Sequence, residues 1–238
     1  MKIGILGGTG NMGRGLAIRW ALKHEIYIGS RRLEKAQRIA KELNSLARGF
    51  YQAEMQGGIT GMVNADAMKE SELVMVTLPP KATVPALTGL KAYFKPKQIV
   101  VSTVVPMVRK EKLFYFASLD AEGGYVPEGK SAAEMVQELV KPVPVVSAFQ
   151  TVPAAYLNNI DAVLNLDVLI AGDDEYSITL VSKLIRDIPN LRPLRVGPLE
   201  NSKWIESFTP LLLNAAILNG LHDPSIRIVP WFPTSSEL

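Results

Sequence analysis

The feature that most restricts the fold of this chain lies within its first thirteen residues. A short apolar run, Lys2–Leu6, is followed almost at once by Gly8-Thr9-Gly10-Asn11-Met12-Gly13, which is a G-x-G-x-x-G pattern. The run predicts a buried parallel strand, and the mixed apolar and basic residues of Asn11–Lys23 predict a helix. A strand, a glycine-rich turn and a helix in this order are typical of a domain that binds a dinucleotide.

Each glycine of the pattern has a mechanical role in such a site. Gly8 permits a tight turn, Gly10 lets the backbone approach a pyrophosphate, and Gly13 lets the helix pack close to the strand. The helix N-terminus then directs its free N–H groups toward the phosphates. The alternative is an ordinary glycine-rich turn, but the strand before the pattern and the helix after it favour a dinucleotide site.

Strand-like and helix-like segments alternate along the rest of the chain. Further strands are predicted at Glu25–Gly29, Leu73–Leu78, Gln98–Val105, Val143–Phe149, Asp167–Ala171 and Leu194–Val196. Further helices are predicted at Leu33–Arg48, Asp174–Ile188 and Glu200–Leu221, loops at Phe50–Gly61 and Asp120–Lys130, and an extended tail at Asp223–Leu238. The alternation predicts a doubly wound α/β fold of Rossmann type, with a mainly parallel sheet and a smaller C-terminal α/β part.

The residues at the end of the second predicted strand indicate which dinucleotide fits. An NAD site usually places Asp or Glu here, but this chain has Gly29-Ser30-Arg31-Arg32, with Lys35 one turn further on. A 2′-phosphate would find a hydroxyl, two guanidinium groups and an ammonium. The alternative is a basic helix start, which is unfavourable because cations oppose the helix dipole at an N-terminus. The pattern therefore favours NADP(H) over NAD(H).

Composition excludes several other kinds of protein. The 238 residues include no cysteine and only two histidines, so disulfides, iron–sulfur clusters and a cysteine nucleophile are excluded, and we expect no metal site. A formal net charge of +3 does not indicate nucleic acid. The longest apolar stretch, Thr209–Leu221, is too short to span a membrane, and no signal peptide is visible. We expect a cytoplasmic protein whose partners are small molecules.

The sequence resembles the family of F420-dependent NADP reductases. The resemblance rests on Gly7–Gly13 and Gly29–Arg32, and on a series of further motifs in order: Ile59–Met62, Ser131–Glu134, Val152–Ala155, Gly172–Asp174, Leu191–Leu194 and Glu206–Leu211. It implies hydride transfer between NADP(H) and the deazaflavin coenzyme F420 as co-substrate, and a homodimer. It also implies an NADP-binding Rossmann domain and a smaller C-terminal domain, which together form the deazaflavin cleft. The turn signal at Lys141–Pro144 places the boundary between them, so that the domains would cover residues 1–145 and 146–238.

The resemblance further implies roles for particular residues. The pyrophosphate would lie against the glycine turn, at Gly8, Thr9, Gly10, Asn11 and Met12, and the 2′-phosphate against Ser30, Arg31 and Lys35, beside Arg32. The adenosine and ribose side would be lined by Thr77, Pro79, Pro80 and Val84, and the nicotinamide side by Val105, Met107 and Ala154. The deazaflavin would lie near Gln150, Ser207 and Thr209.

The chain departs from the resemblance at Gln150, where a member of the family carries a histidine. Glutamine can donate a hydrogen bond to a ring carbonyl, but it carries no proton charge at neutral pH. If the histidine stabilises negative charge on the reduced deazaflavin, Gln150 does so less well.

Direct hydride transfer needs stacked rings rather than a protein acid or base, so no catalytic residue is predicted. The chain shows no triad or carboxylate pair, which argues against a hydrolase. Two alternatives stay open. One is an NADPH-dependent reductase of another acceptor, such as a flavin, an imine or a small carbonyl compound, and the other is a non-catalytic NADP(H)-binding module.

Overall fold

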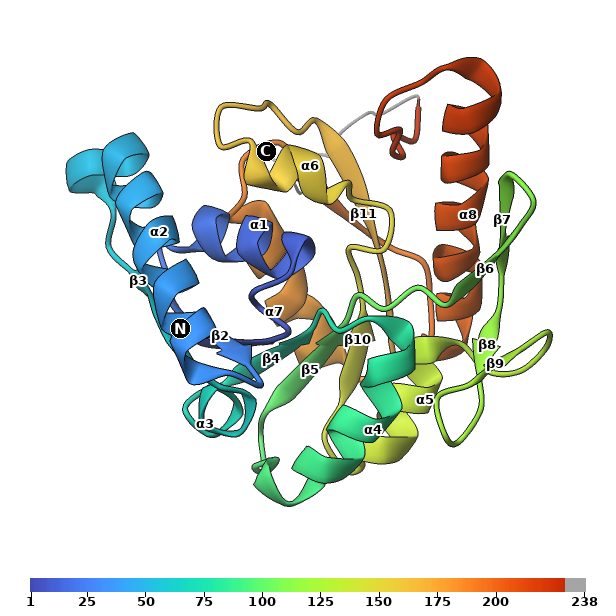
Figure 1. The fold of residues 1–238 in the computed structure, drawn as a ribbon, viewed down its shortest axis with the longest axis horizontal. Helices are drawn as coiled ribbons and strands as arrows, with labels where there is room; N and C mark the ends of the chain where they lie inside the picture. Colours follow the sequence, from blue (N-terminus) through green and yellow to red (C-terminus); the bar gives the residue numbers. More distant parts are fainter. Residues whose placement is uncertain (230–238) are drawn as a thin grey trace.

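The computed structural model describes residues 1–229, and within them eight strands form one sheet in the order β12-β11-β10-β5-β4-β1-β2-β3 (Figure 1). The strands are β1 Lys2–Leu6, β2 Glu25–Ser30, β3 Gly58–Val63, β4 Leu73–Val76, β5 Ile99–Ser102, β10 Val145–Ser147, β11 Leu166–Gly172 and β12 Leu191–Arg195. Neighbouring strands run parallel, except that β10 and β11 are antiparallel. From β3 to β10 the order is that of a dinucleotide-binding fold. The predicted mainly parallel α/β fold is confirmed.

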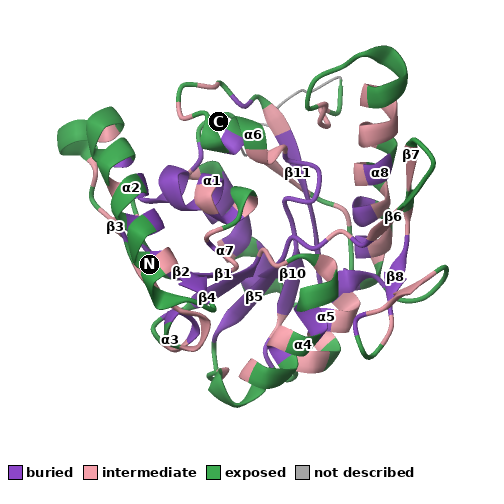
Figure 2. Ribbon diagram, in the orientation of Figure 1, coloured by how far each residue is buried: buried purple, intermediate pink, exposed green. Residues whose placement is uncertain are grey.

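Helices cover both faces of this sheet (Figure 1). They are α1 Asn11–Trp20, α2 Leu33–Tyr51, α3 Asn64–Lys69, α4 Pro80–Leu90, α5 Ala132–Val140, α6 Ala154–Asn158, α7 Glu175–Arg186 and α8 Ser202–Asn219. One core cluster joins the sheet to α1, α2 and α7, and a second joins its other face to α3, α4 and α5. Figure 2 shows the buried residues concentrated in the central strands between these layers.

The central strands are apolar on both faces because helices cover both sides. In β4, Leu73 and Met75 belong to the first cluster, while Val74 and Val76 belong to the second. This alternation follows from the two-residue period of a strand, and it explains why the run contains no polar residue.

Two small antiparallel hairpins interrupt the alternation. The first pairs β6 Met107–Lys110 with β7 Leu113–Phe116, and the second pairs β8 Ser118–Leu119 with β9 Tyr125–Val126. The first hairpin lies along α8 (Figure 1). Asn214 of α8 fixes this contact, because its side chain accepts a hydrogen bond from the Phe114 N–H at 2.7 Å and donates one to the Phe114 carbonyl at 2.8 Å.

The prediction of a loop over Phe50–Gly61 is wrong, since α2 extends to Tyr51 and β3 begins at Gly58. The glycines of this strand weaken its pattern in the sequence, yet the packing of the strand requires glycine. A Cβ at Gly61 would clash with the Ala36 backbone, because α2 packs directly on β3 there. The predicted Asp120–Lys130 loop likewise contains the short strand β9.

The predicted division of the chain at residue 145 falls at the first residue of β10. Val145 pairs with Val100 of β5, and Val146 pairs with Gly172 of β11, so the sheet continues across this point. The division into two domains stays a prediction. Of the tail predicted over Asp223–Leu238, residues 230–238 lie outside the described part of the chain.

Candidate functional site

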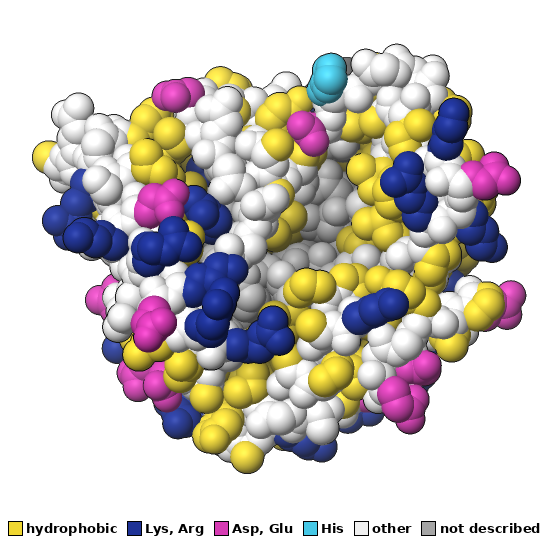
Figure 3. Space-filling view, in the orientation of Figure 1, with side chains coloured by type: hydrophobic (Ala, Val, Ile, Leu, Met, Phe, Trp, Pro, Cys, Tyr) yellow, Lys and Arg dark blue, Asp and Glu magenta, His cyan; other side chains and the backbone are white. Residues whose placement is uncertain are grey.

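A cavity of about 1220 Å³ opens at the carboxyl ends of the parallel strands, beside the point where the strand order reverses between β1 and β4. This is where open α/β sheets bind ligands. Its walls come from the segments that follow β1, β2, β3, β4 and β5. Figure 3 shows the molecule hollowed at its centre, with Lys and Arg side chains gathered over the start of α2 on one side of the hollow.

The glycine turn after β1 forms one wall. The Gly8 N–H donates to the Ile5 and Gly29 carbonyls, both at 3.0 Å, and a Cβ at Gly8 would lie 2.7 Å from Ile28 Cβ. A Cβ at Gly13 would lie 2.6 Å from Gly8 Cα, so α1 can approach β1 only with glycine there. The positive φ of the turn, +78°, belongs to Gly7, one residue before the pattern.

Helix α1 starts at the cavity with its N-terminal N–H groups uncapped. Gly10 is the N-cap residue, no side chain caps the helix, and the first turn holds no acidic residue. Thr9, Gly10, Asn11 and Met12 all line the cavity. Because the N–H groups at the start of a helix carry partial positive charge, this wall suits an anion such as a pyrophosphate.

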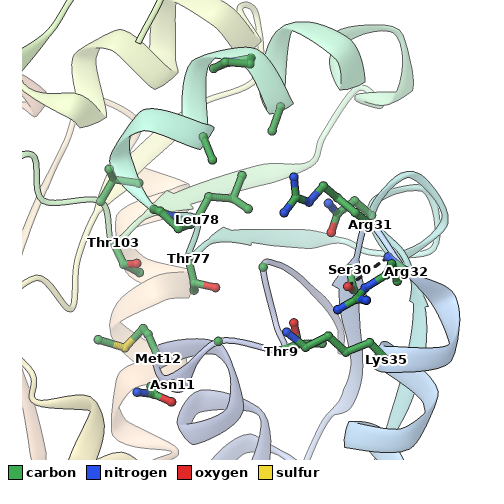
Figure 4. A pocket seen from close by; sticks show the side chains of 18 of the residues that line it. Thr9, Asn11, Met12, Ser30, Arg31, Arg32, Lys35, Thr77, Leu78 and Thr103 are labelled. Atoms are coloured by element: carbon green, nitrogen blue, oxygen red, sulfur yellow. Dashed lines mark hydrogen bonds between the residues drawn. The ribbon is translucent and has the colours of Figure 1, made fainter. Parts of the chain in front are cut away.

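A second wall, at the end of β2, is strongly cationic. Ser30, Arg31, Arg32 and Lys35 all line the cavity, as predicted for the 2′-phosphate side, and they lie close together in Figure 4. The Ser30 hydroxyl accepts a hydrogen bond from the Arg32 N–H at 3.2 Å. Within residues 1–229, none of the three cations forms an ion pair with a carboxylate. This wall, which we call the cationic corner, therefore holds unbalanced positive charge.

The segments after β4 and β5 supply the third wall. Thr77 and Thr103 fix it, because their hydroxyls donate to the Leu6 and Val76 carbonyls at 2.9 and 3.1 Å. Of the residues predicted here, Thr77, Pro79 and Val105 line the cavity, while Pro80 is the first residue of α4 and is not among the lining residues.

Val84 is 3% exposed and faces the protein interior. The same helix instead presents Ala82, Pro85 and Ala86 to the cavity. These three residues are not among those predicted, because the sequence pattern gave no helix after Pro79-Pro80. Had proline been taken as the first residue of a helix, the helical period would have indicated them. Asn64, at the start of α3, was missed for a similar reason: its helix follows the undetected strand β3.

The remaining predicted residues, Gly8 included, are not among the residues that line the cavity. Met107 begins β6 and Ala154 begins α6. Gln150 is 5% exposed, and its side-chain N–H groups donate to the Ser102 carbonyl and the Ser147 hydroxyl at 2.9 and 2.8 Å. Its Oε1 atom is buried and has no hydrogen-bond partner among residues 1–229.

Two predicted residues on α8 differ in what their hydroxyls bind. The Thr209 hydroxyl donates to the Gln150 carbonyl at 2.9 Å, which joins α8 to the loop after β10. The Ser207 hydroxyl donates to the Lys203 carbonyl at 2.6 Å, within its own helix. The roles predicted for Gln150, Ser207 and Thr209 in binding the deazaflavin stay predictions.

Buried charged side chains hold the C-terminal segments near the cavity. The Arg19 guanidinium donates to four backbone carbonyls, those of Tyr156, Leu157, Asn159 and Ala162. Burial lowers the pKa of Arg19 from its ordinary value. Arg19 therefore binds α6 to α1, although its position in the sequence resembles that of an ordinary surface cation.

Glu206 of α8 is a fully buried carboxylate. Its oxygens accept hydrogen bonds from the Ala132 and Ala133 N–H groups at 2.9 and 3.1 Å, at the start of α5. Burial raises the pKa of Glu206 to about 8, although these two N–H groups favour the ionised form. Glu206 thereby joins α8 to α5, and no periodic signal in the sequence indicates this.

Among residues 1–229, no three His, Asp or Glu side chains are grouped so that they could hold a metal ion. The acidic run Asp173-Asp174-Glu175 is engaged in other contacts. Asp174 caps α7 by accepting from the Ser177 N–H at 2.8 Å, and Asp173 accepts from the Leu199 N–H at 3.0 Å. In this described part, no helix is long and apolar enough to cross a membrane.

The sheet order, the glycine turn, the uncapped helix start and the cationic corner together define a protein of the dinucleotide-binding Rossmann class. A family model described as "NADP oxidoreductase coenzyme F420-dependent" matches residues 2–106. The chain belongs to this family, as its similarity to relatives along almost its whole length shows.

Two relatives are both named F420-dependent NADP reductase. The protein from Methanocaldococcus jannaschii is 39% identical over 228 residues, which cover 96% of this chain and 98% of the relative. The protein from Methanothermobacter marburgensis is 34% identical over 229 residues, with 96% and 98% coverage. A solved structure from Arthrobacter sp. FB24 has a TM-score of 0.76 at 21% identity, covering 97% of this chain and all of that one, which shows the same fold.

Proposed function

We propose that this protein is an enzyme that transfers a hydride between NADP(H) and the deazaflavin coenzyme F420. The observation that carries the choice of nucleotide is the unbalanced charge of Arg31, Arg32 and Lys35 beside Ser30. An NAD site would place a carboxylate at this position, whereas a 2′-phosphate needs cations and hydroxyl groups. Membership of the family, with relatives named for F420, supports the second substrate.

The cavity fits the parts of NADP(H) in order. The pyrophosphate would lie at the uncapped start of α1, where Gly10 has no Cβ, and the 2′-phosphate would lie between Arg31 and Lys35, both of which line the same cavity. The adenosine and ribose would lie along the Thr77–Pro79 wall, with α4 beside it. The nicotinamide would then reach Val105, at the far end of the cavity from the cations.

When bound, NADPH supplies the hydride, and NADP⁺ accepts one in the reverse direction. The chain's own contribution is to position the two rings and to exclude water. Orientation of this kind is worth about 7–11 kcal/mol of the barrier in favourable cases. Val104 and Val105 give the wall an apolar surface at the nicotinamide end, and no acid or base among the described lining residues faces it.

We place the deazaflavin on the side formed by Met107, Ala154 and α8. The hydrogen bond from Thr209 to the Gln150 carbonyl supports this, because it holds α8 against the loop after β10. Both N–H groups of the Gln150 amide are already used within the protein. A hydrogen bond from Gln150 to a ring carbonyl therefore requires its side chain to turn out of this arrangement.

The test mixes the protein with NADP⁺ and reduced F420 and follows the return of the oxidised deazaflavin absorbance. Turnover is expected. If NADPH is oxidised only with a flavin, an imine or a small carbonyl compound, the protein is a reductase of another acceptor. Tight NADPH binding without turnover of any acceptor would instead indicate a non-catalytic binding module.

We also propose that the protein assembles as a homodimer, and a stripe of exposed apolar side chains on α8 supports this. Trp204, Phe208, Leu211 and Leu218 are exposed by 66%, 41%, 62% and 69% and follow a helical spacing. An exposed apolar stripe of this kind suits a symmetric contact with a second copy. Sedimentation of the wild type and of Leu211→Glu tests it, since the charge should yield monomers. A cytoplasmic location also stays a prediction.

A further inference from the structure

The β6–β7 hairpin carries a second group of unbalanced cations. Arg109, Lys110 and Lys112 are exposed and surround a single acid, Glu111. Among the ion pairs of residues 1–229 none involves these three cations, whereas other surface arginines do pair, as Arg14 does with Glu42. The tip of the hairpin therefore has excess positive charge with no acidic partner in this part of the chain.

The hairpin starts at the cavity and leads away from it. Val105 lines the cavity, and β6 begins two residues later at Met107. At about 3.3 Å per residue, Arg109 lies about 13 Å along the chain from Val105. In Figure 3, Lys and Arg side chains gather over the hairpin, across the hollow from those over the start of α2. The two groups of cations thus face opposite ends of one hollow.

The hairpin holds two of these cations, Arg109 and Lys110, against aromatic rings. The Arg109 guanidinium lies 5.7 Å from the centre of the Phe114 ring, its cross-strand partner, and Lys110 Nζ lies 5.4 Å from the centre of the Tyr115 ring. Asn214 of α8 binds both backbone groups of Phe114. On the face that carries Arg109, the strand pair begins with the apolar pair Met107 and Phe116, which is nearer the cavity.

We propose that the hairpin tip, Arg109 to Lys112, binds the anionic side chain of the deazaflavin substrate. This inference rests on the proposed function. The coenzyme joins an aromatic deazaflavin ring to an anionic side chain, and the hairpin offers an apolar start and a cationic end in the same order. The alternative is that the charges only keep a short strand pair from associating with other strands.

The experiment compares Arg109→Gln/Lys112→Gln with the wild type, using F420 and the same deazaflavin without its anionic side chain. The KM for F420 is expected to rise about fivefold to tenfold, because two exposed charge contacts are lost. The KM for the shortened deazaflavin and the kcat should not change. The wild-type preference for F420 should also shrink with added salt. Lys183→Gln/Arg186→Gln on α7 is the matched control.

An equal effect on both deazaflavins, or no effect on either, would overturn the hairpin site while the proposed function stands. If the wild type turns over neither deazaflavin, the proposed function fails, and binding is then followed by deazaflavin fluorescence. If the double variant binds F420 more weakly than the wild type does, but binds the shortened deazaflavin equally well, the hairpin site is still supported. Unchanged F420 binding would remove it as well.

Discussion

The two ends of the cavity differ in how the chain fixes them. At the phosphate end, the walls follow β1 and β2 within the first 35 residues, and backbone contacts at Gly8 and Gly13 set their geometry. At the other end, segments from residues 105 to 228 meet, and buried polar side chains hold them. The geometry of the phosphate end therefore depends on its glycines, whereas the geometry of the other end depends on a few buried side chains.

Asp167 illustrates this dependence. It is fully buried in β11 and accepts hydrogen bonds from Arg192 at 2.8 and 2.7 Å and from the Ile228 N–H at 2.6 Å. Burial opposes its ionisation, but these donors keep the pKa of Asp167 below its ordinary value. The segment held in this way also reaches the loop after β10, because the Ser225 hydroxyl donates to the Thr151 carbonyl at 2.7 Å.

The largest effect is expected from Asp167→Ala. The substitution removes the buried carboxylate that binds Arg192, Arg227 and the Ile228 N–H, which should lower the free energy of unfolding by about 3 kcal/mol. NADPH affinity of the remaining folded protein should change little, because the phosphate end does not use Asp167. Denaturant unfolding and NADPH titration measure the two quantities. Glu175→Ala, which removes an exposed pair with Arg195, is the control and should change stability little.

If Asp167→Ala weakened NADPH binding as strongly as it lowered stability, the two ends of the cavity would not be independent of each other.

The next effect concerns the cationic corner. Arg31→Ala should weaken NADPH binding by about 2 kcal/mol, or roughly 30-fold, since a charge-assisted contact to the 2′-phosphate is lost. NADH binding should be unaffected. Arg38→Ala is the matched control, because Arg38 is exposed on α2, which begins just after Arg31, and does not line the cavity. Equal losses for NADPH and NADH would remove the NADP assignment.

The same contrast explains what the sequence could predict. Gly10, Ser30 and Arg31 are close in the chain, and each comes at the end of a strand whose apolar run is visible. Their meeting in one cavity therefore follows from local order alone. Pro79 and Val105 also follow clear strands, and both line the cavity.

The other end could not be predicted in this way because its contacts are specific to tertiary structure. Arg19 lies in the last turn of α1, where a cation commonly faces solvent, yet it binds carbonyls more than 130 residues away. A contact of this kind has no periodic or motif signal.

A smaller effect is expected from pH, through Glu206. Its pKa in the folded protein is about 8, above its ordinary value of 4.5, so the folded state binds this proton more tightly than the unfolded state does. Its contribution to stability is complete below about pH 4.5 and is lost as the pH rises through about 8, by at most about 1.4 kcal/mol per pH unit. Denaturant unfolding between pH 6 and 9 measures this slope.

Glu206→Gln keeps the size of the side chain and removes the titrating proton, so this part of the slope should disappear. Glu200→Gln, at an exposed position just before α8, serves as the control and should keep the wild-type slope. A Glu206→Gln protein with the full wild-type slope would mean that another group is responsible.

The smallest effect is expected on α8, where it separates the roles of two hydroxyls on one helix. Thr209→Val removes the hydrogen bond to the Gln150 carbonyl and should raise the KM for the deazaflavin by about fivefold, the equivalent of about 1 kcal/mol. Ser207→Ala removes only a bond within α8 and should leave this KM unchanged. NADPH affinity should be the same in both variants. If both variants, or neither, changed the KM, the contact between α8 and the loop after β10 would not position the second substrate.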